Sequence, residues 1–280
     1  MVRRWFISLL VVCALAAAQP KRIISTAPSI TEMLYSLGLG DRVVGVTTYC
    51  HYPPDARSKP KIGTYTEPNL ERIASLRPDL VIIQKNPIQL AAKLQALHLN
   101  VLEVSHDTVD DVYVSIGRIA MAAGVSDNAR RITTRMRAEL EDIRKRAATH
   151  PRRRMMFVVG RAPNRIEDMI AVGRASYLNG LFEIAGGENI FKSALAPYPK
   201  VGMEEVLSRN PEVIVDMGDM SQTDDVTDSH KRSVVELWRT YPSVAAVKTG
   251  RVFAVASDMF IVPGPRMVDA ARAFAEMLRP

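Results

Sequence analysis

The sequence predicts an α/β protein of two lobes, each built around a central sheet, that one long rigid helix joins. Short apolar strands alternate with helices in both halves of the chain, and a long polar helix separates the halves. One helix–turn–strand segment also occurs in both halves. The chain has 280 residues, of which 47% are hydrophobic, so it is long enough to bury two cores.

The separating helix is predicted over residues 126–150. Its apolar residues recur at intervals of three and four, which places them on one face, while charged residues fill the other faces. That face consists of Ala129, Ile132, Met136, Leu140, Ile143 and Ala147. Ser126 is expected to be the N-cap and Pro151 to end the helix, which would be about 35 Å long. An ordinary amphipathic surface helix is the alternative interpretation.

Residues 1–18 have the pattern of a signal peptide. Arg3 and Arg4 precede an apolar run that ends in small residues near Ala18. No later apolar run approaches the roughly 18 residues that span a membrane, so the mature chain is expected to be exported and soluble. A lipoprotein is disfavoured, because Val12 is too large to precede a lipidated Cys13.

Cysteine content and charge exclude two classes of protein. Without the signal peptide Cys50 is the only cysteine, so an internal disulfide is impossible. The net charge is +7, and the excess is concentrated in residues 130–154. No aromatic residues interleave with these charges, so nucleic acid is not expected as a partner.

Each lobe is predicted from its alternating elements. The N-terminal lobe, residues 19–125, is expected to have strands at 23–25, 43–46, 80–83 and 101–104 and helices at 29–37, from Asn69, at 87–97 and at 109–123. Its strands are almost continuously apolar, which predicts a parallel sheet covered on both faces. The C-terminal lobe, residues 151–280, is expected to have strands at 155–159, 213–216 and 252–256 and helices at 175–184, 233–239 and 267–278.

An internal repeat relates the two lobes. Residues 70–82 and 203–215 both read as a helix, a turn of Pro and an acid, and a strand. A Lys-apolar-Gly step precedes each copy, at 61–63 and 200–202. Gene duplication and a shared βα pattern both explain this similarity. Ligands of open α/β sheets bind beyond the carboxyl ends of the strands, so the cleft between the lobes is the expected site.

The sequence carries no catalytic signature. It lacks a G-x-S-x-G elbow, an H-E-x-x-H motif, a Walker loop and a G-x-G-x-x-G loop, so an exported enzyme is disfavoured. The histidines also lack the paired spacing of a metal site, which disfavours a zinc or manganese binder, and no cofactor is expected. They are His51, His98, His106, His150 and His230.

Three loops combine tyrosine with proline, at residues 48–54, 63–68 and 197–199. Tyrosines on loops that prolines stiffen form amphipathic platforms, on which a large flat ligand can pack while the hydroxyls reach its polar rim. Half-buried packing is the alternative for any single tyrosine.

The sequence resembles the periplasmic cobalamin-binding proteins of ABC importers. The segments that carry the resemblance are 48–56, 69–82, 186–191, 197–201 and 265–267. The class, often called class III periplasmic binding proteins, also includes haem and ferric-siderophore binders. The resemblance implies a periplasmic monomer with two lobes, one rigid backbone helix, a ligand in the cleft and small opening motions.

The same resemblance implies the ligand-binding residues. They are Tyr49, Tyr65, Asp168, Met169, Tyr198, Met259, Phe260 and Arg266. Two positions depart from the family: Tyr198 stands where cobalamin binders have tryptophan, and Met259 where they tend to have an aromatic residue. A cobalamin-type corrinoid is the first choice of ligand, and haem or a ferric siderophore is the second. Whether Cys50 or His51 approaches a ligand metal stays open.

Two acidic residues are candidates for docking to the transporter. Glu71 and Glu204 occupy matching places in the first turns of the repeated helices, one in each lobe. The resemblance implies that they meet arginines of the two membrane-embedded permease subunits. An acid in a first turn also gains about 0.3–1 kcal/mol from the helix dipole, which explains both residues without a partner. The sequence does not separate a transporter component from a sensor.

Overall fold

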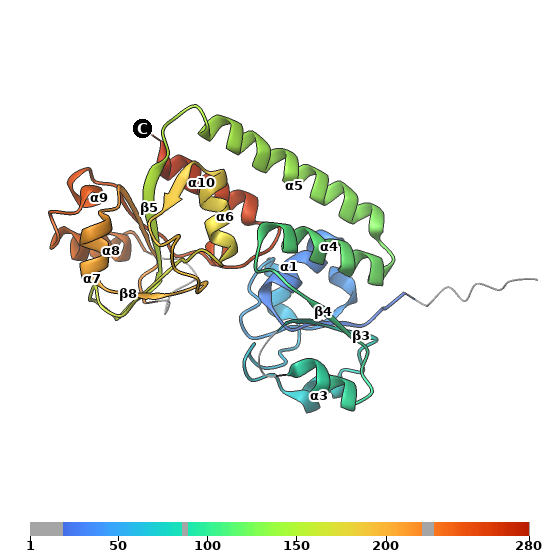
Figure 1. Ribbon diagram of the computed structural model, residues 1–280. Helices are drawn as coiled ribbons and strands as arrows, with labels where there is room; N and C mark the ends of the chain where they lie inside the picture. Colours follow the sequence, from blue (N-terminus) through green and yellow to red (C-terminus); the bar gives the residue numbers. More distant parts are fainter. Residues whose placement is uncertain (1–18, 86–88, 220–226, 280) are drawn as a thin grey trace, which may run out of the picture.

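The computed structural model of the protein describes residues 19–85, 89–219 and 227–279. The signal peptide predicted at 1–18 and the first residues of the helix predicted at 87–97 lie outside these ranges. The chain forms two α/β lobes joined by one long helix, as the sequence predicts (Figure 1). Within the described ranges, no helix combines the length and apolarity needed to cross a membrane.

The N-terminal lobe is built on a four-stranded parallel sheet with the order β2-β1-β3-β4. Its strands are β1 (Ile23–Ser25), β2 (Val43–Gly45), β3 (Leu80–Gln84) and β4 (Val101–Val104). Its helices are α1 (Pro28–Ser36), α2 (Leu70–Ser75), α3 (Leu90–Ala96) and α4 (Val109–Ala123), with 3-10 turns η1 (Gly40–Arg42) and η2 (Pro54–Ser58). Ile82 belongs to the hydrophobic cluster with α1 and α4, whereas Val81 and Ile83 belong to the cluster with α2 and α3. Both faces of the sheet are therefore covered, as predicted.

The C-terminal lobe is built on a six-stranded mixed sheet. The order is β10-β9-β5-β6-β8, and β7 also pairs with β5. The strands are β5 (Arg153–Gly160), β6 (Met169–Ala171), β7 (Gly187–Asn189), β8 (Lys200–Val201), β9 (Val213–Asp216) and β10 (Val252–Ala254). The helices are α6 (Tyr177–Ile184), α7 (Met203–Arg209), α8 (Asp228–Arg239), α9 (Ala245–Lys248) and α10 (Met267–Leu278), with the 3-10 turn η3 (Asp258–Phe260). The antiparallel pairs β5–β6 and β6–β8 were not expected from the sequence.

The repeated segments have the same structure in both lobes. Helix α2 leads into β3 as α7 leads into β9. The parallel order β2-β1-β3-β4 corresponds to the parallel pairings of β7 with β5, of β5 with β9 and of β9 with β10. Ile73 and Val206 occupy matching positions in the two helices, and both are fully buried. Arg77 and Asn210 follow these helices, and both adopt left-handed backbone angles, with φ of 45° and 43°. This agreement supports duplication over chance similarity.

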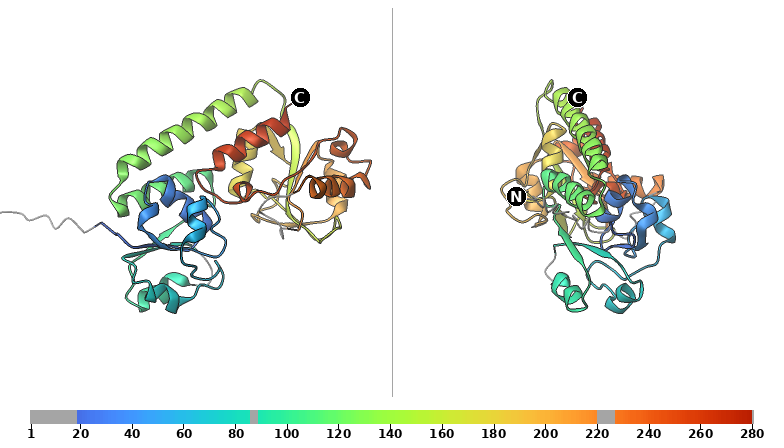
Figure 2. Two further views of the ribbon diagram at one scale, coloured as in Figure 1. Left: turned by 180° about the vertical axis from the view of Figure 1, so that it is seen from behind. Right: turned by 90° about the vertical axis from the view of Figure 1, so that its right-hand side faces the viewer.

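Helix α5 (Ser126–Ala147) joins the lobes and packs against α4 of one lobe and against α6 and α10 of the other (Figure 2). The predicted apolar stripe is buried from Ala129 to Ile143. One continuous hydrophobic cluster runs from the N-terminal sheet along α5 into the C-terminal lobe. The helix begins at Ser126, where the predicted segment begins, but the predicted cap and the predicted C-terminal end were wrong. Val125 is the N-cap position, without a side-chain cap, and the helix ends at Ala147, three residues before His150.

Candidate ligand-binding cleft

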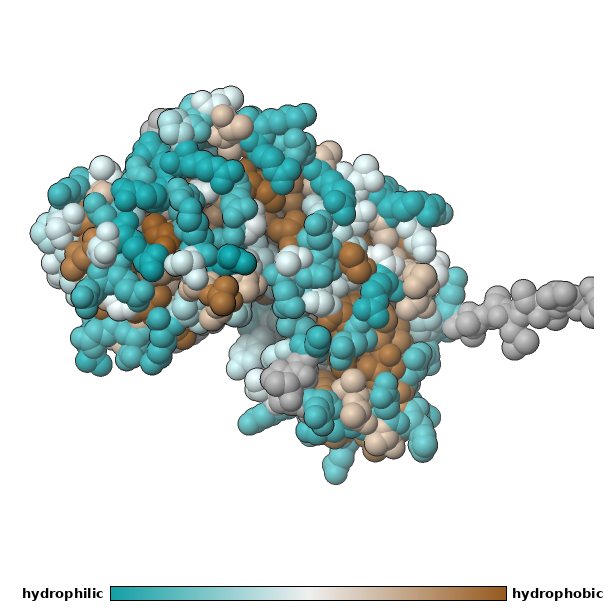
Figure 3. Space-filling view, viewed as in Figure 1, coloured by the Kyte–Doolittle hydropathy of each residue, from teal (hydrophilic) through white to brown (hydrophobic). Residues whose placement is uncertain are grey.

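A cleft separates the two lobes on the side away from α5 (Figure 3). Its N-terminal wall carries the loops that follow β2 and β4, and its C-terminal wall carries the loops around β6, before β8 and after β10. Most of these loops lie at the carboxyl ends of parallel strands, where open α/β sheets bind ligands. The lobes meet near the first turns of α4 and α6, where residues 107–110 and 174–180 line a hollow of about 280 Å³.

At this part of the cleft, Tyr65 and Tyr198 lie near the same carboxylate. The Tyr65 hydroxyl donates to the Lys85 carbonyl at 3.4 Å, and the Tyr198 oxygen accepts from Ser176 Oγ at 3.2 Å. Burial raises the pKa of both phenols, and the carboxylate of Asp107 raises each pKa further. Both predicted tyrosines, one from each lobe, therefore lie within the electrostatic range of Asp107.

The other tyrosines lie on the loop after β2. Tyr49 is 58% exposed, as a platform residue should be. Tyr52, which the site prediction did not include, is 45% exposed. The Cζ atom of Arg266 lies 4.0 Å from the centroid of the Tyr52 ring, so the guanidinium packs over the ring. The signal for Tyr52 was present in the same proline-bearing loop, but the loop alone does not show which tyrosine faces the second lobe.

Arg266 links the lobes. Its guanidinium contacts the Oε1 atom of Glu32, on α1 of the N-terminal lobe, and lies 3.0 Å from Asp258 in its own lobe. Arg266 Nε and Glu32 Oε2 are buried without hydrogen-bond partners, so only one of the two oxygens is paired. Burial raises the pKa of Glu32 to about 7, although Arg266 acts to lower it. A ligand carboxylate would have to compete with these two acids for Arg266.

Gly264 explains how this lobe-to-lobe contact fits. A Cβ atom at position 264 would lie 3.0 Å from Glu32 Oε2, so a side chain there would push the buried carboxylate away. Glycine therefore allows the segment before α10 to pack directly against α1.

The structure places two predicted site residues in the core. Met169 is 1% exposed and Phe260 is 4% exposed. The Phe260 ring packs against Phe157 and Phe274, with centroids 6.2 and 5.4 Å apart. Their side chains do not line the cleft, which corrects the prediction. Met259 is half-buried against the same core.

Asp168 is exposed and is paired with Lys200. Its carboxylate lies 3.3 Å from Lys200 Nζ, and its backbone has a left-handed φ of 50°. The loop before it is anchored by a buried ion pair of Arg161 with Asp216 at 2.9 Å. Trp238 Nε1 donates to the same carboxylate at 2.7 Å, so the charge of Asp216 is well compensated.

Cys50 does not reach the cleft. Its side chain is fully buried, and the hydroxyls of Thr31 and Thr47 lie 3.1 and 3.0 Å from its sulfur. Burial raises the pKa of the thiol, so the thiolate that would bind a metal is disfavoured. His51 is partly buried in the same loop. Across the described part of the chain, no group of three His, Cys, Asp or Glu side chains is placed to hold a metal ion.

The candidate docking residues Glu71 and Glu204 are exposed in the first turns of α2 and α7. Within the residues that the structure describes, neither carboxylate forms a side-chain ion pair. Glu205 differs, because it accepts a hydrogen bond from the Gly202 N–H at 3.3 Å and lies 3.8 Å from Arg209. Of the acids on α7, Glu204 is therefore the one left available.

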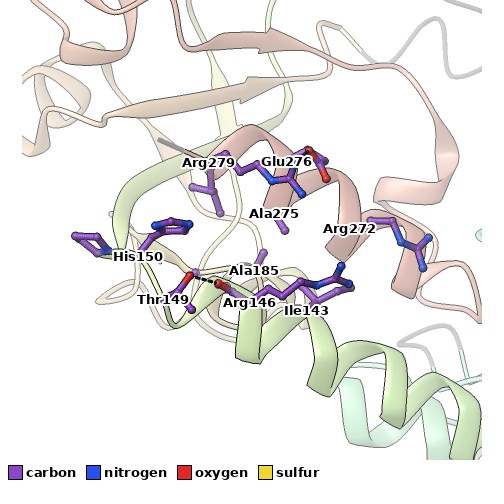
Figure 4. A pocket seen from close by; sticks show the side chains of 13 residues that line it. Ile143, Arg146, Thr149, His150, Ala185, Arg272, Ala275, Glu276 and Arg279 are labelled. Atoms are coloured by element: carbon purple, nitrogen blue, oxygen red, sulfur yellow. Dashed lines mark hydrogen bonds and ion pairs between the residues drawn. The ribbon is translucent and has the colours of Figure 1, made fainter.

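A second hollow, of about 380 Å³, lies away from the cleft where α5, α6 and α10 end (Figure 4). Three helix C-termini carry partial negative charge there, which attracts cations. Arg146, Arg272 and Arg279 line it, and each is already paired with an acid. The negative helix ends account for the presence of these arginines without a ligand. One of them, Arg146, belongs to the basic segment 130–154.

Comparison with known proteins agrees with this architecture. Residues 23–259 match the family described as periplasmic binding protein. The chain belongs to the periplasmic binding protein family. It is 29% identical over 262 residues to a vitamin B12-binding protein of Vibrio cholerae, covering 92% of this chain and 89% of that protein. It is also 30% identical over 270 residues to an uncharacterized ABC transporter substrate-binding lipoprotein of Bacillus subtilis, covering 94% of this chain and 81% of that protein.

Solved structures show the same fold. The crystal structure of the periplasmic vitamin B12-binding protein of Vibrio cholerae matches with a TM-score of 0.79 and 28% identity, over 93% of this chain and 97% of that one. A periplasmic heme-binding protein of Roseiflexus matches with a TM-score of 0.75 and 24% identity, over 92% and 99% of the two chains. The shared fold therefore includes binders of different macrocycles.

Proposed function

We propose that this chain is the exported binding component of an ABC importer, which captures a cobalamin-type corrinoid between its lobes and delivers it to the transporter. The observation that carries the proposal is that each lobe supplies a tyrosine close to where the lobes meet: Tyr65 bonds to Lys85 after β3, and Tyr198 bonds to Ser176, which lines the hollow between the lobes. Its similarity to a vitamin B12-binding protein over 92% of the chain supports the same ligand class.

The cleft suits a large flat ligand with a polar rim. Tyr49 and Tyr198 are 58% and 42% exposed as residues, so their rings can offer apolar faces that a macrocycle covers. Helix α5 and the contact between Glu32 and Arg266 tie the lobes together, so capture needs only a small change in their separation. The cleft walls are therefore largely preformed, which reduces the entropy cost of binding.

An absorbance titration with cyanocobalamin, cobinamide, haemin and a ferric siderophore tests the ligand. We expect the two corrinoids to bind tightest and to share one site. The double variant Tyr65→Ala and Tyr198→Ala tests whether the ligand binds at the two tyrosines. It should lose most of the affinity for corrinoids while keeping its melting temperature. Tight binding of haemin or the siderophore, with no binding of either corrinoid, would replace this proposal with the second ligand class.

Delivery is proposed to use Glu71 and Glu204, one carboxylate from each lobe. Both are exposed and have no ion-pair partner among the described residues, so they remain available to cationic groups of the two permease subunits. We place the mature protein in the periplasm as a monomer, after cleavage near Gln19. N-terminal sequencing of the exported protein, which should start at that residue, tests the cleavage.

A further inference from the structure

The hollow between the first turns of α4 and α6 is lined by charged groups of both signs, two acids from the N-terminal lobe and one arginine from the C-terminal lobe. One of the acids, Asp110, lies 3.7 Å from Arg137 on α5. Asp107 contributes from the loop after β4, and Arg174 from the loop before α6. Both side chains are exposed. The structure shows no ion pair between them, and within its described ranges the Arg174 guanidinium forms no ion pair at all. Each therefore keeps hydrogen-bonding capacity for a ligand.

The carboxylate of Asp107 is only partly used. One of its oxygens accepts from Ser105 Oγ at 3.1 Å, and no described residue donates a hydrogen bond to the other. The remaining oxygen can accept a hydrogen bond from a ligand N–H or O–H, and the negative charge repels a ligand carboxylate.

The opposite wall supplies donors. Arg174 has five N–H groups and no acceptor. The Tyr198 hydroxyl accepts from Ser176, which lines the hollow, and a phenol keeps its own proton to donate. A ligand group in this hollow must therefore accept hydrogen bonds on the C-terminal side and donate them on the N-terminal side.

A primary amide meets both requirements without carrying a charge. A carboxylate can accept from Arg174 but is repelled by Asp107, whereas an ammonium group has the opposite difficulty. We propose that Asp107 and Arg174 form a subsite for a side-chain amide of the corrin ring, and that Asp107 excludes ligands carrying a carboxylate there. The inference rests on the proposed function and sharpens it, because haem carries two carboxylates where corrinoids carry amides.

The test compares cobalamin with its monocarboxylate derivatives, in which one ring amide is hydrolysed to the acid. The ring and the metal are then unchanged. We expect the wild-type chain to bind at least one of these derivatives roughly tenfold more weakly than cobalamin. Two acids, Asp107 and Asp110, line the hollow with one arginine, so the repulsion of a ligand carboxylate exceeds its attraction to Arg174 by about one screened charge. In Asp107→Asn, the ratio of the Kd of the derivative to the Kd of cobalamin should approach one. Haemin should bind this variant more tightly than it binds the wild type.

Two further variants control the result. Arg174→Gln should raise the ratio, because it removes the attraction for a carboxylate and leaves the repulsion. Glu103→Gln removes one negative charge from the neighbouring strand β4, outside the hollow, and should leave the ratio unchanged. Equal affinity of the wild type for cobalamin and all of its monocarboxylates would overturn the inference alone. Absence of any corrinoid binding would overturn both the inference and the proposed function. If Glu103→Gln changed the ratio as much as Asp107→Asn does, the discrimination would come from the overall negative charge of this region, and the subsite would be excluded.

Discussion

The two lobes share one plan, but they differ where they face the cleft. Both sheets have the same order over four strands, and in both a short helix with an exposed glutamate leads into a central strand. The C-terminal lobe departs from the plan through the antiparallel β6 and β8 and through buried Asp216, which stands where the N-terminal lobe has Ile83. The shared part presents the two glutamates proposed for docking, and the added part contributes to the second wall of the cleft.

The largest expected effect tests whether the two lobes dock as a matched pair. Reversing both charges, with Glu71→Arg and Glu204→Arg, should abolish stimulation of the transporter ATPase, because two attractions become repulsions. Ligand affinity should be unchanged. Reconstituted membranes with each single variant then show whether the lobes contribute equally, and added salt should weaken the wild-type interaction. Normal uptake by the double variant would exclude this role for the glutamates.

The next effect concerns the position at which the lobes differ in polarity. Asp216→Ala leaves the guanidinium of Arg161 buried without its partner, so the free energy of unfolding should fall by about 3–5 kcal/mol. The matched change in the other lobe, Ile83→Val, removes one methyl group and should cost about 1 kcal/mol. Urea titrations of both variants measure this difference. Similar losses would mean that Asp216 contributes no more than packing.

A pH effect is expected from the contact between the lobes. The pKa of Glu32 is about 7 in the folded chain and 4.5 when unperturbed, so between these values the folded state holds a proton that the unfolded state has released. The free energy of unfolding should therefore fall as the pH rises from 4.5 to 7, by about 3 kcal/mol from this group. Thermal melts of Glu32→Gln should lack this fall, whereas Glu71→Gln should retain it. An identical pH dependence in Glu32→Gln would contradict the assignment.

The smallest expected effect compares the two cleft walls. A tyrosine ring that buries roughly 80 Å² against the ligand contributes about 2 kcal/mol, so Tyr65→Ala and Tyr198→Ala should each weaken binding roughly thirtyfold. Tyr198→Phe keeps the ring and loses only the hydroxyl, so its loss should be clearly smaller. Calorimetry separates these cases. Unchanged affinity in both alanine variants, at unchanged melting temperature, would place the ligand elsewhere.

Elements with a long periodic pattern could be predicted from the sequence, and short ones could not. The apolar stripe of α5 extends over 22 residues, which fixes its identity, whereas β6 and β8 have three and two residues and show no period. These two strands exist because they pair with β5 and with each other, which is a tertiary property. The same limit applies to α9, which has four residues.

The candidate site shows the same division. Tyrosine and proline in the loops indicated Tyr49, Tyr65 and Tyr198 as ligand-binding residues, and all three are at least partly exposed, while their contact with a ligand stays a prediction. The partners of Arg266 could not be predicted, because Glu32 lies 234 positions away. Phe260 was wrongly expected in the cleft, since one turn of 3-10 helix decides whether it or its neighbours face the core. Asp107 had a usable signal, because it follows β4 at the carboxyl edge of the sheet.

The apolar stripe of α5 also determines how the protein unfolds. Its buried residues contribute to one hydrophobic cluster that includes both Ile23 of the first sheet and Phe274 of the last helix. Neither lobe can therefore melt without exposing part of the surface that stabilises the other. We expect one calorimetric transition, with equal van't Hoff and calorimetric enthalpies, although the chain has two sheets and two additional smaller cores. In this molecule the connecting helix is the element that makes folding cooperative.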